Sequence, residues 1–203
     1  TMGTTASRHL KALVDAMPGV RTISVVDAEG SVLATSRDEL IGMNFSQREY
    51  FKVPREYPDP ATLYVSPPFK TVLGVFSITV ARVATGSRGE FAGIIVATLD
   101  PEYFNVLLRS VHYAPDMSTA IAHGDGKAFL QVPAGRRVLG ADLAKPGSFF
   151  TRHRDSGQTA TIMTGIGYTT GDERMMAVRT IRPANVPMDK PLVIAVGRDL
   201  AAI

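Results

Sequence analysis

The sequence contains no cysteine among its 203 residues. This absence excludes disulfide bonds, thiolate nucleophiles and metal sites with cysteine ligands, and it is compatible with both the cytosol and the periplasm. The sequence also lacks a run of like charges, because its Lys and Arg residues are scattered among acidic ones and the formal net charge is only +3. No nucleic acid is therefore expected as a partner.

Long hydrophobic runs are absent as well. The longest nearly uncharged apolar stretches, at 91–99 and 192–196, are far shorter than the ~20 residues that a membrane-spanning helix needs. With 45% hydrophobic and 20% charged residues, the composition predicts a soluble, folded chain with room for one large or two small domains. No signal peptide is visible at the start, so any targeting or anchoring segment is expected outside these residues.

The histidines do not suggest a metal site. The four of them are dispersed, lack the spacing of metal ligands and have no cysteine nearby, so we expect single surface or turn histidines and predict neither a metal nor a cofactor. They are His9, His112, His123 and His153.

An enzyme would need converging catalytic groups. His153, Asp155 and Ser156 have the residue types of a hydrolase triad, but neighbours on one loop rarely converge in space. Gly171-Asp172-Glu173 is superficially similar to the signature of a nucleotide cyclase, yet it lacks the second Gly and the Phe, and it lies between two β-rich runs where a turn is needed. We predict a hairpin tip there and no enzymatic activity.

Hydrophobic periodicity predicts an opening helix and two similar blocks of strands. Leu10, Leu13, Val14 and Met17 have helical spacing, which Pro18 and Gly19 end. The first block has a hairpin at 23–35, a connection at 40–68 with a short helix capped by Ser46, and two central strands of an antiparallel sheet at 75–83 and 91–99, before a helix that starts at Pro101. The second block has a hairpin at 119–130, a short connector helix at 140–150, three strands at 159–166, 174–181 and 192–196, and the first turn of a helix at 198–203.

Four segments of the first block carry a resemblance to a known family. They are 46–51 (SQREYF), 63–68 (LYVSPP), 78–82 (ITVAR) and 89–100 (GEFAGIIVATLD), and they resemble, in the same order, the distal module of double Cache sensors. The resemblance covers about residues 10–200. After residue 110 it rests on 122–126 and 193–197 and on the repeated pattern of strands.

The resemblance implies an α+β fold with tandem PAS-like antiparallel-sheet modules. The implied organisation is an N-terminal helix at 1–19, a membrane-distal Cache module at 20–115, a membrane-proximal Cache module at 116–198 and the start of a C-terminal helix towards the membrane at 199–203. Such sensors lie in the periplasm between two membrane helices of a bacterial transmembrane signalling protein. The output implied here is a diguanylate cyclase or a histidine kinase, and the full-length protein is expected to form a homodimer.

The resemblance also implies a ligand site in the distal module. In members that bind amino acids, an arginine and aromatic residues hold the carboxylate, and an aspartate at the end of the last distal strand holds the amine. The guanidinium group offers a planar fork of donors, and an acidic side chain complements ammonium. The matching residues are Arg48, Tyr50, Tyr64 and Asp100, with Phe51 where the family pattern favours tyrosine and Arg82 added by strand alternation.

Two alternatives stay open for these residues. Arg48 could pair with Asp100 or with a surface acid, Tyr50 and Phe51 could belong to the core, and Asp100 could cap the next helix. Arg82 could lie on the solvated face of its strand. The domain as a whole could then be a scaffold or dimerisation module without a ligand. If these residues do form a ligand site, we expect its partner to be a small polar molecule, either anionic or amino-acid-like.

Overall fold

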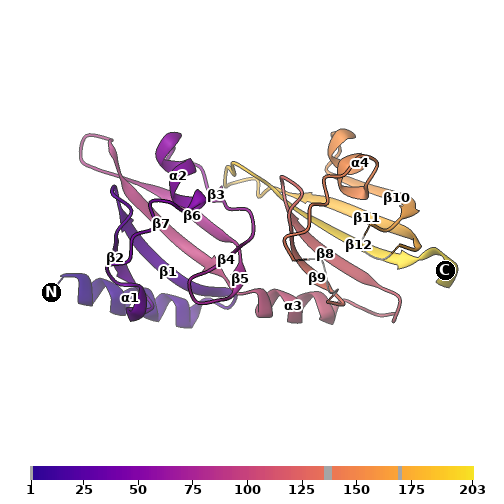
Figure 1. Ribbon diagram of the computed structural model, residues 1–203, viewed down its shortest axis with the longest axis horizontal. Coiled ribbons are helices and arrows are strands. Elements are labelled where there is room, and N and C mark those ends of the chain that lie inside the picture. The colour runs from indigo at the N-terminus through magenta and orange to yellow at the C-terminus, as the bar shows by residue number, and fades with distance from the viewer. Residues whose placement is uncertain (1, 135–138, 169–170) are drawn as a thin grey trace. The chain divides into compact units, whose positions relative to one another are not determined.

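The computed structural model describes residues 2–134, 139–168 and 171–203 (Figure 1). The chain forms two compact units, which we call the first and the second module. The first module comprises Thr1–Ser66, Ser77–Asp100 and Ala184–Asp189, and the second comprises Pro67–Phe76, Pro101–Pro183 and Lys190–Ile203. Each module is built on its own five-stranded antiparallel sheet, as the repeated pattern of strands predicted.

The first module has the strand order β2-β1-β7-β6-β3. Helix α1 packs against β1 and β2, and α2 packs against β6, β3 and β7, so the two helices lie on opposite faces (Figure 1). The core lies under α2 and includes Phe51, Ile94 and Val96. The elements are α1 (Met2–Ala16), β1 (Val20–Asp27), β2 (Val32–Thr35), a 3-10 turn (Asp38–Leu40), α2 (Glu49–Glu56), β3 (Tyr64–Val65), β6 (Thr79–Thr85) and β7 (Phe91–Leu99).

The second module repeats this layout with the strand order β10-β11-β12-β8-β9. Helix α3 packs against β9, and α4 packs against β10 and β11. The elements are α3 (Pro101–Ser110), β8 (Ser118–His123), β9 (Ala128–Val132), α4 (Phe149–Asp155), β10 (Ala160–Ile166), β11 (Glu173–Ile181), β12 (Leu192–Asp199) and a final 3-10 turn (Leu200–Ala202). Between the two large sheets in sequence, β4 (Phe69–Lys70) and β5 (Phe76–Ser77) form a short two-stranded sheet.

Local turn chemistry explains the predicted hairpins. At the β1–β2 turn, the Asp27 carboxylate accepts hydrogen bonds from the backbone N–H groups of Glu29 and Ser31, at 3.0 and 2.8 Å. Gly30 has φ 91°, and a Cβ atom there would lie 2.5 Å from the backbone nitrogen of Ser46. Only glycine fits both demands. The hairpin therefore fixes the start of the long connection that leads to α2.

Three predicted boundaries were wrong. The connector helix predicted at 140–150 is replaced by α4 at Phe149–Asp155, because Gly140 and Gly147 have φ 74° and 75°, which a right-handed helix does not accommodate. Ser148 caps α4 by accepting the Thr151 N–H at 3.1 Å.

The other two corrections concern α2 and the end of the chain. Helix α2 starts after Arg48 rather than at Ser46, whose N–H donates to the Asn44 side chain at 3.0 Å. The helical turn predicted at 198–203 is confined to the 3-10 turn at Leu200–Ala202, because β12 continues to Asp199 through its pairing with β11. Within the described residues, no helix has both the length and the apolar character needed to cross a membrane.

Candidate functional site

Arg48 and Tyr50 lie together at the start of α2. Arg48 is the N-cap residue in extended conformation, and its N–H donates to the Phe45 carbonyl at 2.9 Å. Both side chains are half-buried, and the Tyr50 ring contacts the Phe45 ring edge-on at 6.3 Å between centroids. Burial raises the pKa of Tyr50 to about 12, while the Arg48 charge acts in the opposite direction. A neutral phenol therefore stands beside a guanidinium group here.

Tyr64 is buried and holds a loop in place. Its hydroxyl group donates to the Tyr57 carbonyl and accepts the Asp59 N–H at 3.0 Å. Burial is the main reason that the pKa of Tyr64 is raised above its ordinary value. With both hydrogen bonds directed at the loop, Tyr64 can offer a ligand its ring but not a free hydroxyl.

Phe51 and Arg82 do not join Arg48 in an open site. Phe51 is 0% exposed, with its ring 5.9 Å from Phe91, and therefore belongs to the core. Arg82 is exposed, because strand alternation turns it away from its buried neighbours Ala81 and Val83. The structure thus places Phe51 inside the packing and Arg82 on the solvated face, against the sequence-based prediction for both.

Asp100 lies at the far end of the sheet from Arg48. Its N–H donates to the Gly19 carbonyl at 2.8 Å, next to the start of β1, and its carboxylate is 4.0 Å from the Arg21 guanidinium. Arg48 follows Phe45, whose N–H donates to the Gly30 carbonyl at 2.7 Å, just beyond the other end of β1. The ends of an eight-residue strand are about 23 Å apart. Arg48 and Asp100 are therefore not brought together as the resemblance implied.

A row of hydroxyl groups on the core-facing side of the first sheet was missed from the sequence. Thr22, Thr98 and Thr79 stand in register on β1, β7 and β6. Thr79 is 2% exposed, and its Oγ1 atom has no hydrogen-bond partner among the residues that the structure describes. Since buried hydroxyl groups are normally satisfied, Thr79 marks a place where a polar ligand atom could bind. In a sequence, threonines in a strand simply read as good strand formers.

Two of the four histidines are buried, which corrects the expectation of surface or turn positions. His123 and His153 are each 1% exposed. His153 Nδ1 lies 2.8 Å from the Thr161 hydroxyl and Nε2 lies 2.9 Å from the Thr180 hydroxyl, so the ring ties α4 to β10 and β11. Burial lowers the pKa of His153. The described residues contain no cluster of His, Asp and Glu suited to a metal ion.

The side chains of the possible triad bind other groups instead of one another. Ser156 Oγ donates to the backbone carbonyl of His153 at 2.6 Å, not to its ring. Asp155 binds Arg154 at 2.9 Å. The His153 ring nitrogens are occupied by threonine hydroxyls, so no nucleophile lies beside a base here.

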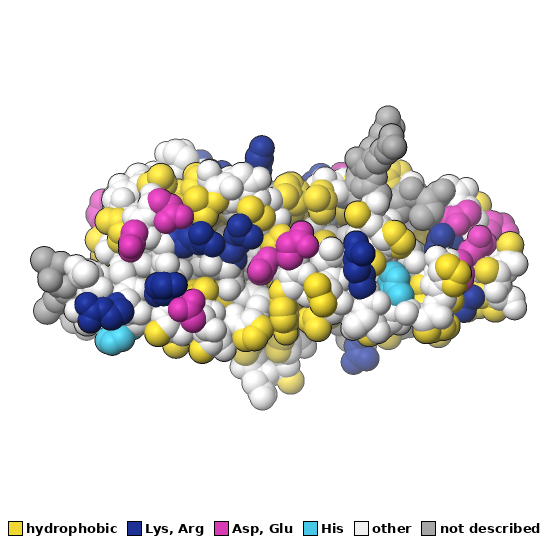
Figure 2. Space-filling view, turned by 90° about the horizontal axis from the view of Figure 1, so that it is seen from below, with side chains coloured by type: hydrophobic (Ala, Val, Ile, Leu, Met, Phe, Trp, Pro, Cys, Tyr) yellow, Lys and Arg dark blue, Asp and Glu magenta, His cyan; other side chains and the backbone are white. Residues whose placement is uncertain are grey.

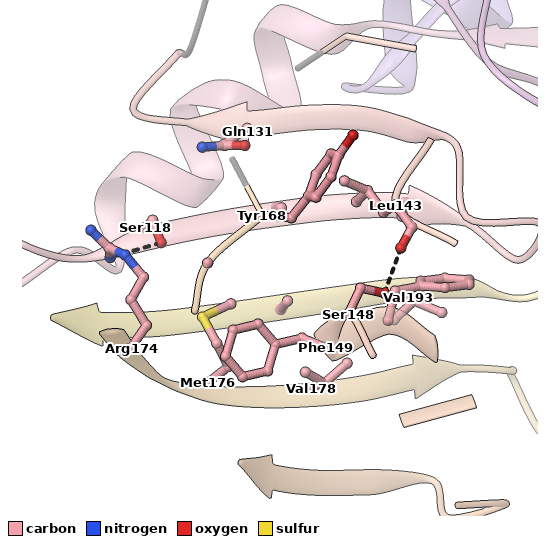
Figure 3. Close-up of a pocket in the computed structure, with 15 residues that line it drawn as sticks. Ser118, Gln131, Leu143, Ser148, Phe149, Tyr168, Arg174, Met176, Val178 and Val193 are labelled. Carbon is pink, nitrogen blue, oxygen red and sulfur yellow. Dashed lines mark hydrogen bonds between the residues drawn. The ribbon is translucent and has the colours of Figure 1, made fainter. Parts of the chain in front are cut away.

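The second module contains a cavity of about 80 Å³ between its sheet and α4 (Figure 3). Figure 3 shows Gln131 and Tyr168 on one side and Phe149, Met176 and Val178 on the other. The lining residues are mostly apolar or small: Ser118, Ala120, Ala122, Gln131, Leu143, Ser148, Phe149, Phe150, Gly167, Tyr168, Arg174, Met176, Val178, Val193 and Ala195. No sequence motif pointed to this cavity, because its floor consists of short side chains on separate strands.

Arg174 is the one charged residue in this lining, and its charge is compensated. Its Nε and Nη2 atoms each donate to the Asp172 carboxylate at 2.8 Å, in a bidentate ion pair. Its Nη1 atom donates to the Asp116 carbonyl at 2.9 Å and to the Ser118 hydroxyl at 3.2 Å. Asp172 and Gly171 lie just before β11, as the predicted hairpin tip requires.

Comparisons with known proteins identify solved domains that share this architecture. No protein-family model and no curated protein matches the chain. Solved structures do match. The extracellular domain of the candidate histidine kinase rpHK1S-Z16 is 25% identical, with a TM-score of 0.82, over 97% of this chain and 77% of that one. The periplasmic sensory domain of the Campylobacter jejuni chemoreceptor Tlp1 is 12% identical, with a TM-score of 0.68, over 98% and 87%.

A third neighbour was solved with a ligand. The ligand-binding domain of the Pseudomonas fluorescens chemoreceptor CtaA, in complex with L-leucine, is 16% identical, with a TM-score of 0.64, over 98% of this chain and 78% of that one. The three neighbours are sensory domains of kinases and chemoreceptors rather than catalytic domains. This chain therefore has the tandem PAS-like fold of extracytoplasmic sensor domains, and the resemblance to double Cache sensors is confirmed.

Proposed function

We propose that this chain is the extracytoplasmic ligand-sensing domain of a bacterial transmembrane signalling protein and has no enzymatic activity of its own. The observation that carries the proposal is the tandem PAS-like fold, which the chain shares at a TM-score of 0.82 with the extracellular domain of a candidate histidine kinase. A histidine kinase output is favoured by that neighbour, and a diguanylate cyclase is the alternative implied by the sequence. The first module would be membrane-distal and the second membrane-proximal, with the signal passing through the terminal helices.

The ligand that we propose is a small anionic or zwitterionic molecule held in the first module. Arg48 would bind its carboxylate through the planar fork of guanidinium donors, beside the neutral phenol of Tyr50. The Tyr64 ring would contribute apolar area. Phe51 and Arg82 support or border this region without contacting the ligand. Asp100 lies too far from Arg48 to hold the amine of a small ligand whose carboxylate Arg48 binds.

A ligand-free scaffold is the second candidate function. It is favoured by the burial of Phe51 and by the two hydrogen bonds that already satisfy the Tyr64 hydroxyl. In this case the modules would only space and pair the membrane helices. The two candidates differ in whether a small molecule stabilises the isolated domain.

A thermal-shift screen separates the two candidates. A panel of amino acids, dicarboxylates and short organic acids is mixed with the domain, and a ligand present at about 100 times its Kd stabilises the folded state by about 2.7 kcal/mol. For a chain of this size we expect the Tm to rise by about 5 to 10 °C. A panel in which no anionic or zwitterionic compound raises the Tm would favour the scaffold.

The full-length protein is expected to form a parallel dimer, whereas this fragment should associate weakly or not at all. On the face that carries α1, charged and hydrophobic side chains lie side by side, and Leu13 is exposed (Figure 2). Tethering in a membrane raises the effective concentration of such a weak contact. Because these 203 residues include no cysteine, Lys11→Cys gives this domain a single cysteine as a cross-linking site. Cross-linking in membranes checks the prediction, and a full-length protein that stays monomeric there would contradict it.

A further inference from the structure

The two sheets repeat the same arrangement but leave different amounts of space above their centres. Strands β1 and β7 of the first sheet correspond in order to β8 and β12 of the second. On the core-facing side, the first sheet carries Val26 and Val96 where the second carries Ala122 and Ala195. The valines are buried in a continuous core, whereas the alanines line the cavity shown in Figure 3. The cavity of the second module therefore lies over smaller side chains than those at the corresponding positions of the first core.

We infer that this cavity is a second ligand site, distinct from the Arg48 region, and that it takes a small uncharged molecule. A cavity of about 80 Å³ is about half as large as a ~150 Å³ cavity that holds benzene, which leaves room for roughly three to five non-hydrogen atoms. Tyr168 lines the cavity and is itself 57% exposed, so the cavity reaches solvent beside this residue. Part of a slightly longer ligand can project there.

The lining selects against charge. Arg174 is already neutralised by the bidentate contact with Asp172 and is further held by the Asp116 carbonyl and the Ser118 hydroxyl. A carboxylate in the cavity would have to displace Asp172, and an ammonium group would face Arg174 itself. Either would pay the cost of desolvating a charge without a matched partner.

The remaining groups define what an uncharged ligand gains. Phe149, Met176 and Val178 supply apolar walls on one side, and the Gln131 amide and the Tyr168 hydroxyl supply hydrogen-bonding groups on the other (Figure 3). The Met176 side chain lies across Gly197, where a Cβ atom would be 2.0 Å from the methionine sulfur, so any larger residue at position 197 would displace Met176 from its place in the cavity wall. A short alkyl chain with one carbonyl or hydroxyl group, such as a small ketone or alcohol, matches this division.

Methyl NMR of the whole domain tests the site with 2-butanone as the probe. Methionine is labelled with ¹³C at its methyl group, and the Met176 signal is assigned from a Met176→Leu spectrum. We expect a saturable shift of the Met176 signal, with Met43 of the first module unchanged. Butanoate and butylammonium, which have a similar chain length, should bind at least about fivefold more weakly than 2-butanone, because the site offers no free charge.

Two variants are designed to fill the cavity, and a third variant is the matched control. Ala195→Leu should abolish the saturable shift, and Ala120→Val, on the neighbouring strand, should weaken it. Ala177→Leu makes the same change as the first variant on the exposed face of β11 and should leave binding intact. Arg48→Ala should also leave it intact, which separates this site from the proposed site in the first module.

Several results would overturn the inference. These are no saturable shift at Met176 in the unaltered domain, tighter binding of butanoate or butylammonium than of 2-butanone, or binding that survives both filling variants. Failure of both filling variants to fold would show that the second module has no spare volume, and it would count against the site in the same way.

Discussion

Replacing Arg48 by alanine is expected to weaken binding of an anionic or zwitterionic ligand by more than about tenfold, which corresponds to at least ~1.5 to 3 kcal/mol for a lost charge-assisted contact. The side chain is half-buried beside Tyr50, so it would meet a ligand where water screens the charge only partly. Calorimetry with the ligand found in the thermal-shift screen measures the change. Arg48→Lys, which retains the charge but lacks the planar fork, should recover only part of the affinity.

The matched control for this prediction is Lys52→Ala. Lys52 is an exposed cation one turn further along α2, so its loss removes the same net charge without touching the proposed site. We expect nearly unchanged affinity in that variant. Melting of the unliganded Arg48→Ala protein distinguishes a binding role from a structural one. An unchanged affinity together with a large loss of Tm would show that Arg48 is a structural residue and that the site assignment is wrong.

Local signals were sufficient to predict much of the fold. The hairpin at Gly30, the helix start at Pro101 and the two apolar central strands depend on residues close in sequence, whose backbone preferences are strong. The connector helix was placed wrongly because glycine conformation is not visible in a sequence. Gly140 and Gly147 both adopt positive φ, and the helix begins only after the second of them.

The candidate site was harder to predict because it depends on distant contacts. Arg48 and Tyr50 are neighbours in sequence and were correctly expected near each other, whereas Asp100 could be placed only through the pairing of β7 with β1. Strand alternation alone does not show which side of β6 faces the core. In the structure, Arg82 lies on the side that faces solvent. The cavity of the second module was invisible in the sequence, since alanines on separate strands carry no motif.

The two modules differ in where polar groups are buried, and this bears on how each could respond to a ligand. In the first module the buried hydroxyl of Thr79 lacks a partner among the described residues, so a ligand can improve the hydrogen bonding of the folded state. In the second module Arg174 and His153 are already hydrogen-bonded, and the cavity is lined mostly by apolar or small side chains beside the uncharged polar groups of Gln131 and Tyr168. The first module is therefore suited to a polar ligand and the second to an uncharged one.

Replacing His153 by alanine is expected to destabilise the second module by about 3 kcal/mol, because the change opens a cavity in a packed site and leaves two half-buried threonine hydroxyls without their partner. The unaltered protein should also lose stability in acid. Burial lowers the pKa of His153 in the folded state, so folded and unfolded chains are both neutral at this residue only when the pH is well above its ordinary pKa of about 6.5. As the pH falls below that value, the unfolded chain gains a proton before the folded one does, and stability falls until the lowered folded-state pKa is passed.

Hydrogen exchange of β10 and β11 amides between pH 7.5 and pH 5, corrected for the intrinsic rates, measures this loss in the second module itself. His153→Gln should remove that part of the pH dependence, whereas His9→Gln, on the exposed side of α1, should leave it unchanged. A pH dependence that persists in His153→Gln would show that another group is responsible and that the buried imidazole does not set the acid stability of this module.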